Sequence, residues 1–428
     1  MKWRAAGALL AMVAGSVLAL PPADAVAVQT CGVSHIWTLC LTVPDGALTG
    51  DVPISVTVSG KDRDKLEKLI FTYRPSGGSS VELIRDFERP YGFLWPTGKE
   101  LDGTGVLAVQ VESTSNDVGE KVRATVTLAN GNVGSIPRNP ADWAARFHPE
   151  MPPAGDPVIA AVGRGAMGKR VNDQVIDSIL ARAPSLFLYL GEVYEFGTYA
   201  SMRNWYGLAD VDDPSGEGTA WGRMASYTAP TAGNHDTLEG TGPWLDYWHQ
   251  RPLYTSFDFG GVHYLDLDSN CGQVGGCGTT SKQYAFFKAD LQANSLPCVV
   301  AYWNKTILSL DDFREGSSMI ELWSLIAKNG GDLVLNAGGH GMEEWKPLNP
   351  TLQAGRWNSH MVELNVSSGT DRWERVYRPD DRNAWQAYPQ LGALSMTADG
   401  GAVGPATALT WTFHDTAGTT LRWNSVSC

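Results

Sequence analysis

The sequence predicts an α/β domain preceded by a smaller all-β domain. Three observations support this fold class. The chain has 428 residues, which is long for one ordinary domain. Between about residues 32 and 135, short β-type runs are separated by turn signals, whereas after Pro157 apolar strands alternate with candidate helices. With 47 Gly, 16 Trp and 43 % hydrophobic residues, the composition is that of a globular chain with enough apolar material for a large core.

The first 25 residues have the pattern of a secretory signal peptide. A basic start, Met1–Arg4, precedes the apolar run Ala5–Leu20 and the cleavage-type sequence Ala23–Ala25. This run is short for a membrane anchor, and no later segment is long and apolar enough to cross a bilayer. We therefore expect a secreted, extracellular protein without a membrane span.

Export makes disulfide bonds plausible, and the six cysteines are even in number. Two pairs would each close a short loop, and the two remaining cysteines would then bond to each other. The favoured bridges are Cys31–Cys40, Cys271–Cys277 and Cys298–Cys428. None of the spacings resembles a zinc site.

The formal net charge of −13 argues against binding to nucleic acid through bulk electrostatics. We expect a small-molecule ligand or substrate as the partner, and the sequence indicates no particular oligomeric state.

Residues 26–135 are expected to form a β-sandwich of the immunoglobulin type, because strand-like runs recur at regular spacing. The runs are Ile54–Val58, Leu69–Tyr73, Val81–Leu83, Gly105–Glu112 and Val122–Leu128. This domain shows no obvious chemistry.

A proline-rich linker is expected over residues 136–157, followed by the α/β domain over residues 158–428. The late strands suggest a mixed sheet or a second sandwich. The expected strands are Val158–Val162, Leu186–Leu190, Gly261–Leu267, Val299–Trp303, Leu333–Asn336, Met361–Val366, Leu391–Thr397 and Ala408–Phe413. The expected helices are Asn172–Ala183, Tyr199–Leu208, Ser281–Ala293 and Ser317–Lys328.

Polar residues follow several of these strands, at the carboxyl ends where α/β folds place their sites. They lie at Gly163–Arg164, Gly191–Glu192, Gly233–Asp236, Trp303–Asn304 and Asn336–His340. In the Gly233–Asp236 loop, an Asn oxygen can bind a hard cation and a neighbouring His can act as a proton donor. An ordinary polar turn is the alternative interpretation of that loop.

Several segments, taken in order, resemble the calcineurin-like metallophosphoesterases, close to the purple acid phosphatases. They are Leu41–Gly46, Trp221–Asp236, Ser269–Cys271 with Cys277, and Cys298–Trp303. The similarity is greatest to a secreted actinobacterial group with an N-terminal immunoglobulin-like domain. It implies a four-layer α/β/β/α sandwich preceded by a small all-β domain.

The family uses two adjacent metal ions, and this sequence departs from its ligand pattern. Arg164 stands where the family has the first Asp ligand, and Glu192 stands where it has the bridging Asp. Tyr194 could match the Tyr ligand of purple acid phosphatases, while Asn234 and His235 match the third motif.

The last two motifs depart as well. Asn304 and Lys305 replace a strand-end His, and in the last motif Gly338 replaces the first His while His340 aligns with the second.

An arginine in place of an aspartate changes the electrostatics of the first metal position. Two unit charges about 4 Å apart interact by about 4 kcal/mol at an effective dielectric constant of 20. We therefore predict that no metal binds there and that the Arg164 guanidinium pairs with Glu192. No cofactor is favoured. The alternative is a weakly bound divalent cation, whose ligands would be Glu192, Asn234 and His340.

Three functions are consistent with these residues. The favoured one is a non-hydrolytic or repurposed homologue that binds an anionic or apolar small molecule, with metal-independent cyclisation or elimination as one version. The candidate ligand-binding residues are Arg164, Tyr194, Asn234, Asn304 and Lys305, and the candidate catalytic residues are His235, Glu192, His340 and Arg164. The alternatives are an active phosphoric ester hydrolase with an altered metal site and a cell-surface adhesion protein.

Other charged residues have simpler interpretations. Asp236 is expected to orient the His235 loop, and His263 to pack within its strand. The pairs Asp311–Asp312, Glu343–Glu344 and Asp380–Asp381 are expected to be solvated loop charges.

Overall fold

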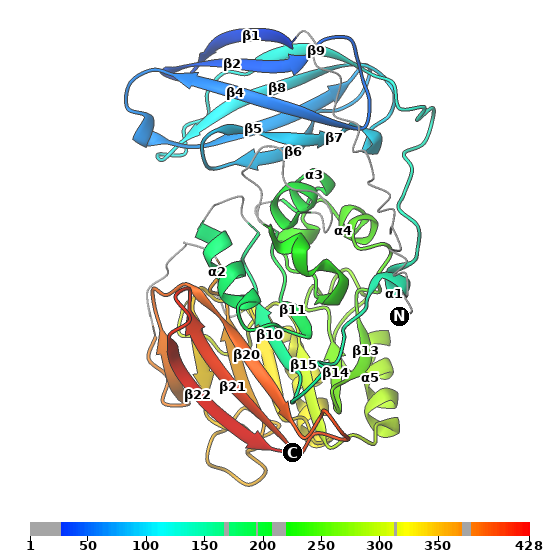
Figure 1. Ribbon diagram of the computed structural model, residues 1–428, viewed down its shortest axis with the longest axis vertical. Helices are drawn as coiled ribbons and strands as arrows, with labels where there is room; N and C mark the ends of the chain where they lie inside the picture. Colours follow the sequence, from blue (N-terminus) through cyan, green and yellow to red (C-terminus); the bar gives the residue numbers. More distant parts are fainter. Residues whose placement is uncertain (1–26, 167–170, 194–195, 208–219, 312–314, 370–377) are drawn as a thin grey trace, which may run out of the picture.

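The fold is a mixed α/β arrangement with far more strand than helix (Figure 1). The structure is a computed structural model that describes residues 27–166, 171–193, 196–207, 220–311, 315–369 and 378–428. The predicted signal peptide lies outside the described residues. Within the described ranges, no helix has both the length and the apolar character needed to cross a membrane.

Two sheets form near the start of the chain, at the top of Figure 1. One has the order β1-β2-β4-β7 and the other the order β3-β9-β8-β5-β6. The first consists of β1 (Ala27–Ser34), β2 (Trp37–Pro44), β4 (Asp51–Ser59) and β7 (Tyr91–Pro96). The second consists of β3 (Ala47–Leu48), β9 (Val122–Leu128), β8 (Gly103–Ser113), β5 (Leu66–Pro75) and β6 (Val81–Asp86).

Buried aromatic residues join these two sheets. Buried and exposed positions alternate along β4 and β9, so each strand turns one face to the interior. Phe71 of β5 lies 4.9 Å from Phe93 of β7, centroid to centroid, and Tyr73 lies 4.9 Å from Trp95. Side chains from one sheet therefore pack directly against those of the other.

The proline-rich segment after β9 is largely exposed but is tied to the later chain at several points. It contains the short helix α1 (Trp143–Arg146). The Trp143 amide donates to the His249 carbonyl oxygen at 3.2 Å, and the Arg251 guanidinium lies 4.2 Å from a Trp143 ring centroid. Near its end, Asp156 accepts a hydrogen bond from the Gly400 amide at 3.0 Å. Contacts with the later chain thus hold this predicted linker at several points.

Two larger sheets form from the rest of the chain. The six-stranded sheet has the order β12-β11-β10-β20-β21-β22, and the seven-stranded sheet has the order β13-β14-β15-β16-β18-β17-β19. The first contains β12 (Thr228–Pro230), β11 (Leu186–Tyr189), β10 (Val158–Val162), β20 (Gly392–Asp399), β21 (Ala408–Asp415) and β22 (Thr420–Ser427). The second contains β13 (Thr255–Phe259), β14 (Val262–Asp266), β15 (Cys298–Tyr302), β16 (Leu333–Asn336), β18 (Val362–Val366), β17 (Met342–Trp345) and β19 (Asn383–Ala387).

Short helical segments connect these strands. The α-helices are α2 (Val171–Leu180), α3 (Tyr199–Ser201), α4 (Gly242–Tyr247), α5 (Lys282–Ala293) and α6 (Ile320–Lys328). A π-helical turn over Met202–Tyr206 continues α3, where the sequence had predicted one regular helix. Ser281 caps α5 by accepting a hydrogen bond from the Tyr284 amide at 3.1 Å.

The first two sheets contact the rest of the molecule through this α3 region (Figure 1). The Asn204 side chain makes paired hydrogen bonds with the backbone of Leu94 on β7, at 2.9 and 3.0 Å. Lys99 forms an ion pair with Asp246 of α4 at 2.7 Å. The N-terminal sheets are therefore fixed against the segment that follows β11.

The structure contains three disulfides. Cys31–Cys40 joins β1 to β2, Cys271–Cys277 closes a loop after β14, and Cys298–Cys428 joins β15 to the last residue. These are the bridges that the spacing favoured, and they are compatible with an extracellular location.

Candidate functional site

The polar residues after β10 and β11 lie side by side because these strands are parallel neighbours. The parallel contact continues beyond the strands themselves: the Leu190 amide donates to the Val162 carbonyl oxygen at 3.0 Å, and the Arg164 amide donates to the Gly191 carbonyl oxygen at 3.0 Å. Arg164 and Glu192 are therefore held close to each other by backbone hydrogen bonds.

The seven-stranded sheet adds residues to the same place. The side-chain nitrogen Nδ2 of Asn304 donates to the Leu190 carbonyl oxygen at 2.9 Å. The backbone carbonyl oxygen of Asn304 accepts from the Ala337 amide at 2.9 Å. The strand ends approach so closely that glycine is required: a Cβ on Gly191 would lie 2.7 Å from the Gly233 amide nitrogen. Four strand ends from two sheets thus meet at Gly191.

A buried ion pair lies at the centre of this site. Arg164 Nε is 3.5 Å from Glu192 Oε2, and the two residues are only 5 % and 2 % exposed. Both adopt left-handed backbone conformations, with φ of 55° and 78°. Such conformations are costly for residues with side chains and are common at functional sites. The pair predicted from the sequence is present.

Asp236 connects the Glu192 loop to the Gly233–Asp236 loop. Its carboxylate accepts hydrogen bonds from the backbone amides of Glu192 at 2.8 Å, Gly233 at 2.7 Å and Val193 at 2.5 Å. Burial raises the Asp236 pKa to about 6, and the three amide donors oppose that rise. Asp236 therefore orients both loops, in agreement with the role inferred from the sequence.

The neighbouring candidate residues are more accessible. Asn234, His235 and Lys305 are each partly buried. The Lys305 amide donates to Ser269 Oγ at 3.1 Å. Burial raises the Asp268 pKa to about 6, and the nearby positive charge of Lys305 opposes that rise. Lys305 thus lies close to an acidic side chain.

Tyr194, which the sequence also predicted to bind the ligand, lies outside the described residues.

His340 lies against Asp311, a residue outside the predicted set of ligands. Its Nδ1 lies 3.1 Å from Asp311 Oδ2, and its amide donates to the same oxygen at 2.9 Å. A Cβ on Gly338 would lie 2.8 Å from the Lys305 Cα, so the backbone leaves little room for a side chain there. The loop that carries His340 therefore presses against the Asn304–Lys305 loop.

The donor set does not suit the two-metal centre of the resembling family. Among the described residues, no group of three or more His, Cys, Asp or Glu side chains could hold a metal ion. Glu192, the carboxylate at the end of β11, already faces a guanidinium.

Sequence reasoning missed a buried acidic cluster beside the site. Asp311 and Glu343 are fully buried and Glu344 is 2 % exposed, so the prediction that they are solvated is wrong. Glu343 accepts hydrogen bonds from the Leu310 amide at 2.9 Å and from Asn365 at 2.6 Å. Burial raises its pKa to about 7. The only available signal was the short apolar-flanked run Met342–Trp345, which forms β17.

A second buried glutamate holds the same loop. Glu363 of β18 accepts hydrogen bonds from the amides of Ile307 at 3.0 Å and Leu308 at 3.3 Å. Burial raises the Glu363 pKa to about 8, while hydrogen bonds from these amides oppose the rise. Glu343 and Glu363 together hold the loop that follows Asn304 and Lys305.

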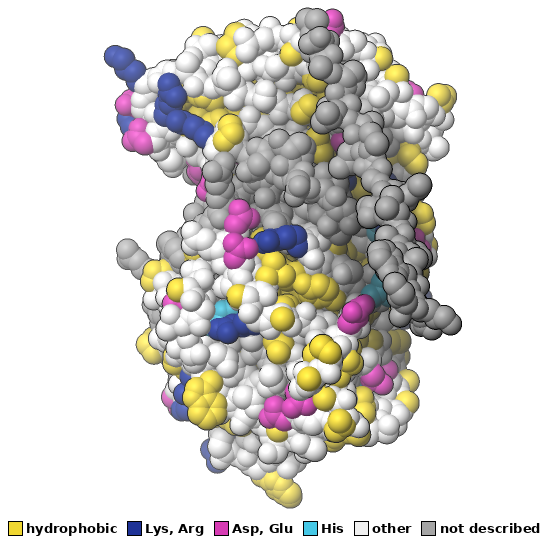
Figure 2. Space-filling model, viewed as in Figure 1, with side chains coloured by type: hydrophobic (Ala, Val, Ile, Leu, Met, Phe, Trp, Pro, Cys, Tyr) yellow, Lys and Arg dark blue, Asp and Glu magenta, His cyan; other side chains and the backbone are white. Residues whose placement is uncertain are grey.

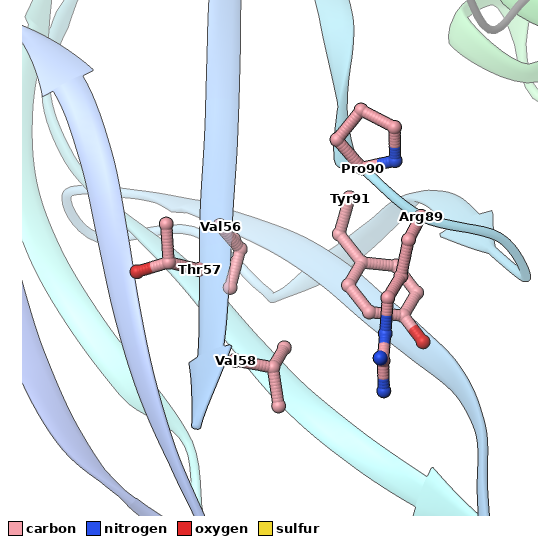
Figure 3. Close-up of a pocket in the computed structure, with 6 residues that line it drawn as sticks. All are labelled: Val56, Thr57, Val58, Arg89, Pro90 and Tyr91. Atoms are coloured by element: carbon pink, nitrogen blue, oxygen red, sulfur yellow. The ribbon is translucent and has the colours of Figure 1, made fainter. Parts of the chain in front are cut away.

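A separate surface hollow lies on the N-terminal sheets (Figure 3). Its volume is about 370 Å³, and it is lined by Val56, Thr57, Val58, Arg89, Pro90 and Tyr91. None of these residues belongs to the strand-end site. On the face drawn in Figure 2, Lys and Arg side chains form small separate groups rather than one continuous patch.

Comparison with known proteins supports the fold and little more. No protein-family model and no curated protein sequence matches the chain. Among solved structures, it is similar to the purple acid phosphatase PPD1 from yellow lupin (Lupinus luteus) seeds, with a TM-score of 0.50 and 11 % identity over 91 % of this chain and 79 % of that one. It also matches GAP50, the anchor in the inner membrane complex of Plasmodium, with a TM-score of 0.46 and 12 % identity over 64 % of this chain and 89 % of that one.

The similarity to the lupin phosphatase indicates a metallophosphoesterase-like fold. At 11 % identity it does not extend to the activity of that enzyme.

Proposed function

We propose that this protein is a metallophosphoesterase-like homologue that binds an anionic small molecule without a two-metal centre. The observation that carries the proposal is the buried ion pair between Arg164 and Glu192 at the ends of β10 and β11. In the resembling family these positions belong to the metal ligands. Here the guanidinium supplies the positive charge in place of a cation.

Electrostatics support this reading. A guanidinium about 4 Å from a divalent ion would repel it by roughly twice the 4 kcal/mol of two unit charges at an effective dielectric constant of 20. Glu192 would have to give up its partner before it could bind a metal. Leaving a buried charge unpaired is costly. The ion pair therefore opposes metal binding in two ways: Arg164 repels the cation, and Arg164 would lose its partner if Glu192 bound the metal.

The remaining groups suit an anion. Lys305 and His235 are partly accessible, and a positively charged side chain binds phosphate, sulfate or carboxylate through charge-assisted hydrogen bonds. The ligand would contact Arg164, Asn234, Asn304 and Lys305, with Tyr194 as a further proposed contact. If chemistry occurs, His235 and Glu192 are the candidate proton-transfer groups.

We further propose the finer assignments that the sequence suggested. Residues 1–25 would be a signal peptide, residues 26–135 an immunoglobulin-like domain, and residues 158–428 a four-layer α/β/β/α sandwich. Edman sequencing of the protein exported by a producing cell would show whether the mature chain starts near Val26.

Metal analysis and calorimetry together test the function. We expect purified protein to contain no stoichiometric Fe, Mn or Zn, to leave p-nitrophenyl phosphate uncleaved, and to bind inorganic phosphate. Lys305→Ala should weaken phosphate binding by about 10- to 150-fold, because one charge-assisted hydrogen bond is worth about 1.5–3 kcal/mol. Stoichiometric metal together with turnover would instead identify an active phosphoric ester hydrolase.

A further inference from the structure

The hollow on the N-terminal sheets lies where β4 extends beyond the first residue of its neighbour β7 (Figure 3). The two strands are antiparallel, and their pairing stops at the contact between Val56 and Tyr91. Within the part of the chain that the structure describes, β4 pairs from Thr57 to Ser59 with β2 alone. Because alternate residues of a strand direct their backbone groups to the same side, this stretch presents unpaired backbone groups to the hollow.

The segment between β6 and β7 is fixed in place beside this open edge. Pro90, just before Tyr91, has no amide hydrogen and cannot add a further bond to the strand pairing. The buried carboxylate of Asp86 accepts hydrogen bonds from the Gly92 amide at 2.7 Å and from the Glu88 amide at 3.2 Å. The hollow is therefore a preformed feature of the fold.

An arginine without an ionic partner lines the hollow. Arg89 is exposed, and among the described residues its guanidinium forms no hydrogen bond or ion pair. It lies 5.9 Å from the centroid of the Tyr91 ring, and Figure 3 shows its side chain beside that ring, across the hollow from Val58. A second hollow of about 500 Å³ shares Arg89 and Tyr91 with the first and is also lined by Arg63, Asp64, Phe87 and Glu88.

The direction of β7 decides which end of an added strand meets Arg89. β7 runs antiparallel to β4 and away from the hollow, starting with Tyr91 opposite Val56. A strand added in line with β7 would run from the position opposite Ser59 towards Tyr91. β7 itself occupies the next positions along β4, so the added strand has to end there. Its terminal carboxylate would then lie next to Arg89, whereas a strand in the opposite direction would bring an ammonium group to the guanidinium.

The pattern of burial along β4 indicates the side chains that such a strand would carry. Val58 is partly buried and lies between the exposed residues Thr57 and Ser59. Residues directly opposite each other in an antiparallel pair point to the same face of the sheet. The residue opposite Val58, which is the last but one of the added strand, should therefore be apolar and have polar neighbours.

We propose that this hollow binds the free C-terminal tail of another protein, which adds a short antiparallel strand to β4 and places its carboxylate on Arg89. Guanidinium and carboxylate groups pair through charge-assisted hydrogen bonds, and an exposed sheet edge binds extended peptides through their backbone. The tail of this chain is not the occupant, because Cys428 is bonded to Cys298. The proposal concerns a surface outside the strand-end site and does not depend on the function proposed for that site.

Fluorescence anisotropy with two labelled peptides tests the carboxylate contact. Both have the sequence Thr-Ser-Thr-Val-Thr, one with a free carboxylate and the other with a C-terminal amide. We expect the amide to bind at least about tenfold more weakly, because it loses the charged pair with Arg89. Arg89→Gln should remove this preference. Arg63→Gln is the matched control, since Arg63 is also exposed but lines only the second hollow, and it should keep the preference.

Methylation of single backbone nitrogens tests the strand pairing separately. Only alternate residues of a strand direct their N–H groups to the neighbouring strand. Of two peptides methylated at the last residue or at the one before it, one should lose affinity and the other should not. Equal effects of the two methylations would overturn strand addition. Equal binding of acid and amide by the unaltered protein, or no binding at millimolar peptide, would overturn the proposal even where a variant does not fold.

Discussion

The carboxylate of Asp236 accepts the backbone amide hydrogen of Glu192 at 2.8 Å and thereby joins the loop after β11 to the loop after β12. The same oxygen accepts from Gly233 at 2.7 Å. One buried side chain therefore helps to fix the backbone of Glu192, next to which backbone hydrogen bonds hold Arg164.

Asp236→Asn should destabilise the protein and weaken ligand binding. The amide nitrogen of asparagine would replace one acceptor and face a backbone donor, at a cost of about 1–3 kcal/mol. Thermal unfolding and phosphate calorimetry measure the two effects. Asp177→Asn is the control, because Asp177 is exposed and its pair with Arg223 is at the surface. Full binding by Asp236→Asn would contradict the positioning role.

Arg164→Ala should lower the free energy of unfolding by about 3–5 kcal/mol, because it leaves the Glu192 carboxylate buried without its partner. The double variant Arg164→Met with Glu192→Gln should recover much of that loss, since no unpaired charge remains. Chemical denaturation measures both. Additivity of the single variants Arg164→Met and Glu192→Gln in the double variant would show that the residues do not interact. Arg223→Ala, in an exposed pair, should change stability by less than about 1 kcal/mol.

Stability should fall as the pH rises from about 4.5 to about 8. Burial raises the pKa of Glu343 to about 7 and that of Glu363 to about 8, above the ordinary value of 4.5. The folded protein therefore binds these protons more tightly than the unfolded chain, and the stabilisation is lost as the pH passes the folded pKa values.

The expected loss is on the order of a few kcal/mol by denaturation at a series of pH values. Glu363→Gln keeps an acceptor for the Ile307 amide and should flatten this dependence, while the exposed Glu239→Gln should not. An unchanged slope in Glu363→Gln would mean that Glu363 does not titrate in this range.

Arg164→Asp combined with Asn304→His should create binding of Mn²⁺ or Zn²⁺ that the unaltered protein lacks. The change removes a repulsive charge and adds a carboxylate and an imidazole near Glu192, which should tighten binding at least about tenfold. Calorimetry with each metal measures the gain. Adding Gly338→His should lower the melting temperature, because a Cβ there lies 2.8 Å from the Lys305 Cα. Equal metal affinity in the unaltered protein would contradict the role given to Arg164.

The sequence predicted strands best where apolar runs had clear ends. Val158–Val162 and Leu333–Asn336 have the predicted bounds, and both are wholly or almost wholly buried. It missed β17, β19 and β22, which carry polar residues whose burial or pairing depends on distant partners. Glu344, for example, is buried because Arg422 and Asn424 of β22 bind it at 2.7 and 2.8 Å.

The site was predictable to a similar extent. Arg164 and Glu192 could be paired from the sequence, because both stand where the resembling family has ligands of one metal centre, and the structure places them on neighbouring parallel strands. The contact between His340 and Asp311 could not, since it depends on how two loops pack against each other. The same holds for the orientation of the Asn304 amide, which a carbonyl group far away in sequence determines.

Adjacent residues of β17 face opposite ways and serve different parts of the molecule. Glu343 holds Leu310, in the loop that begins at Asn304, whereas Glu344 holds Arg422 on the outer strand β22. β17 therefore makes side-chain hydrogen bonds on both of its faces, to the loop after β15 on one and to β22 on the other. Two adjacent carboxylates of one strand therefore link the loop that begins at Asn304 to the outer strand of the other large sheet.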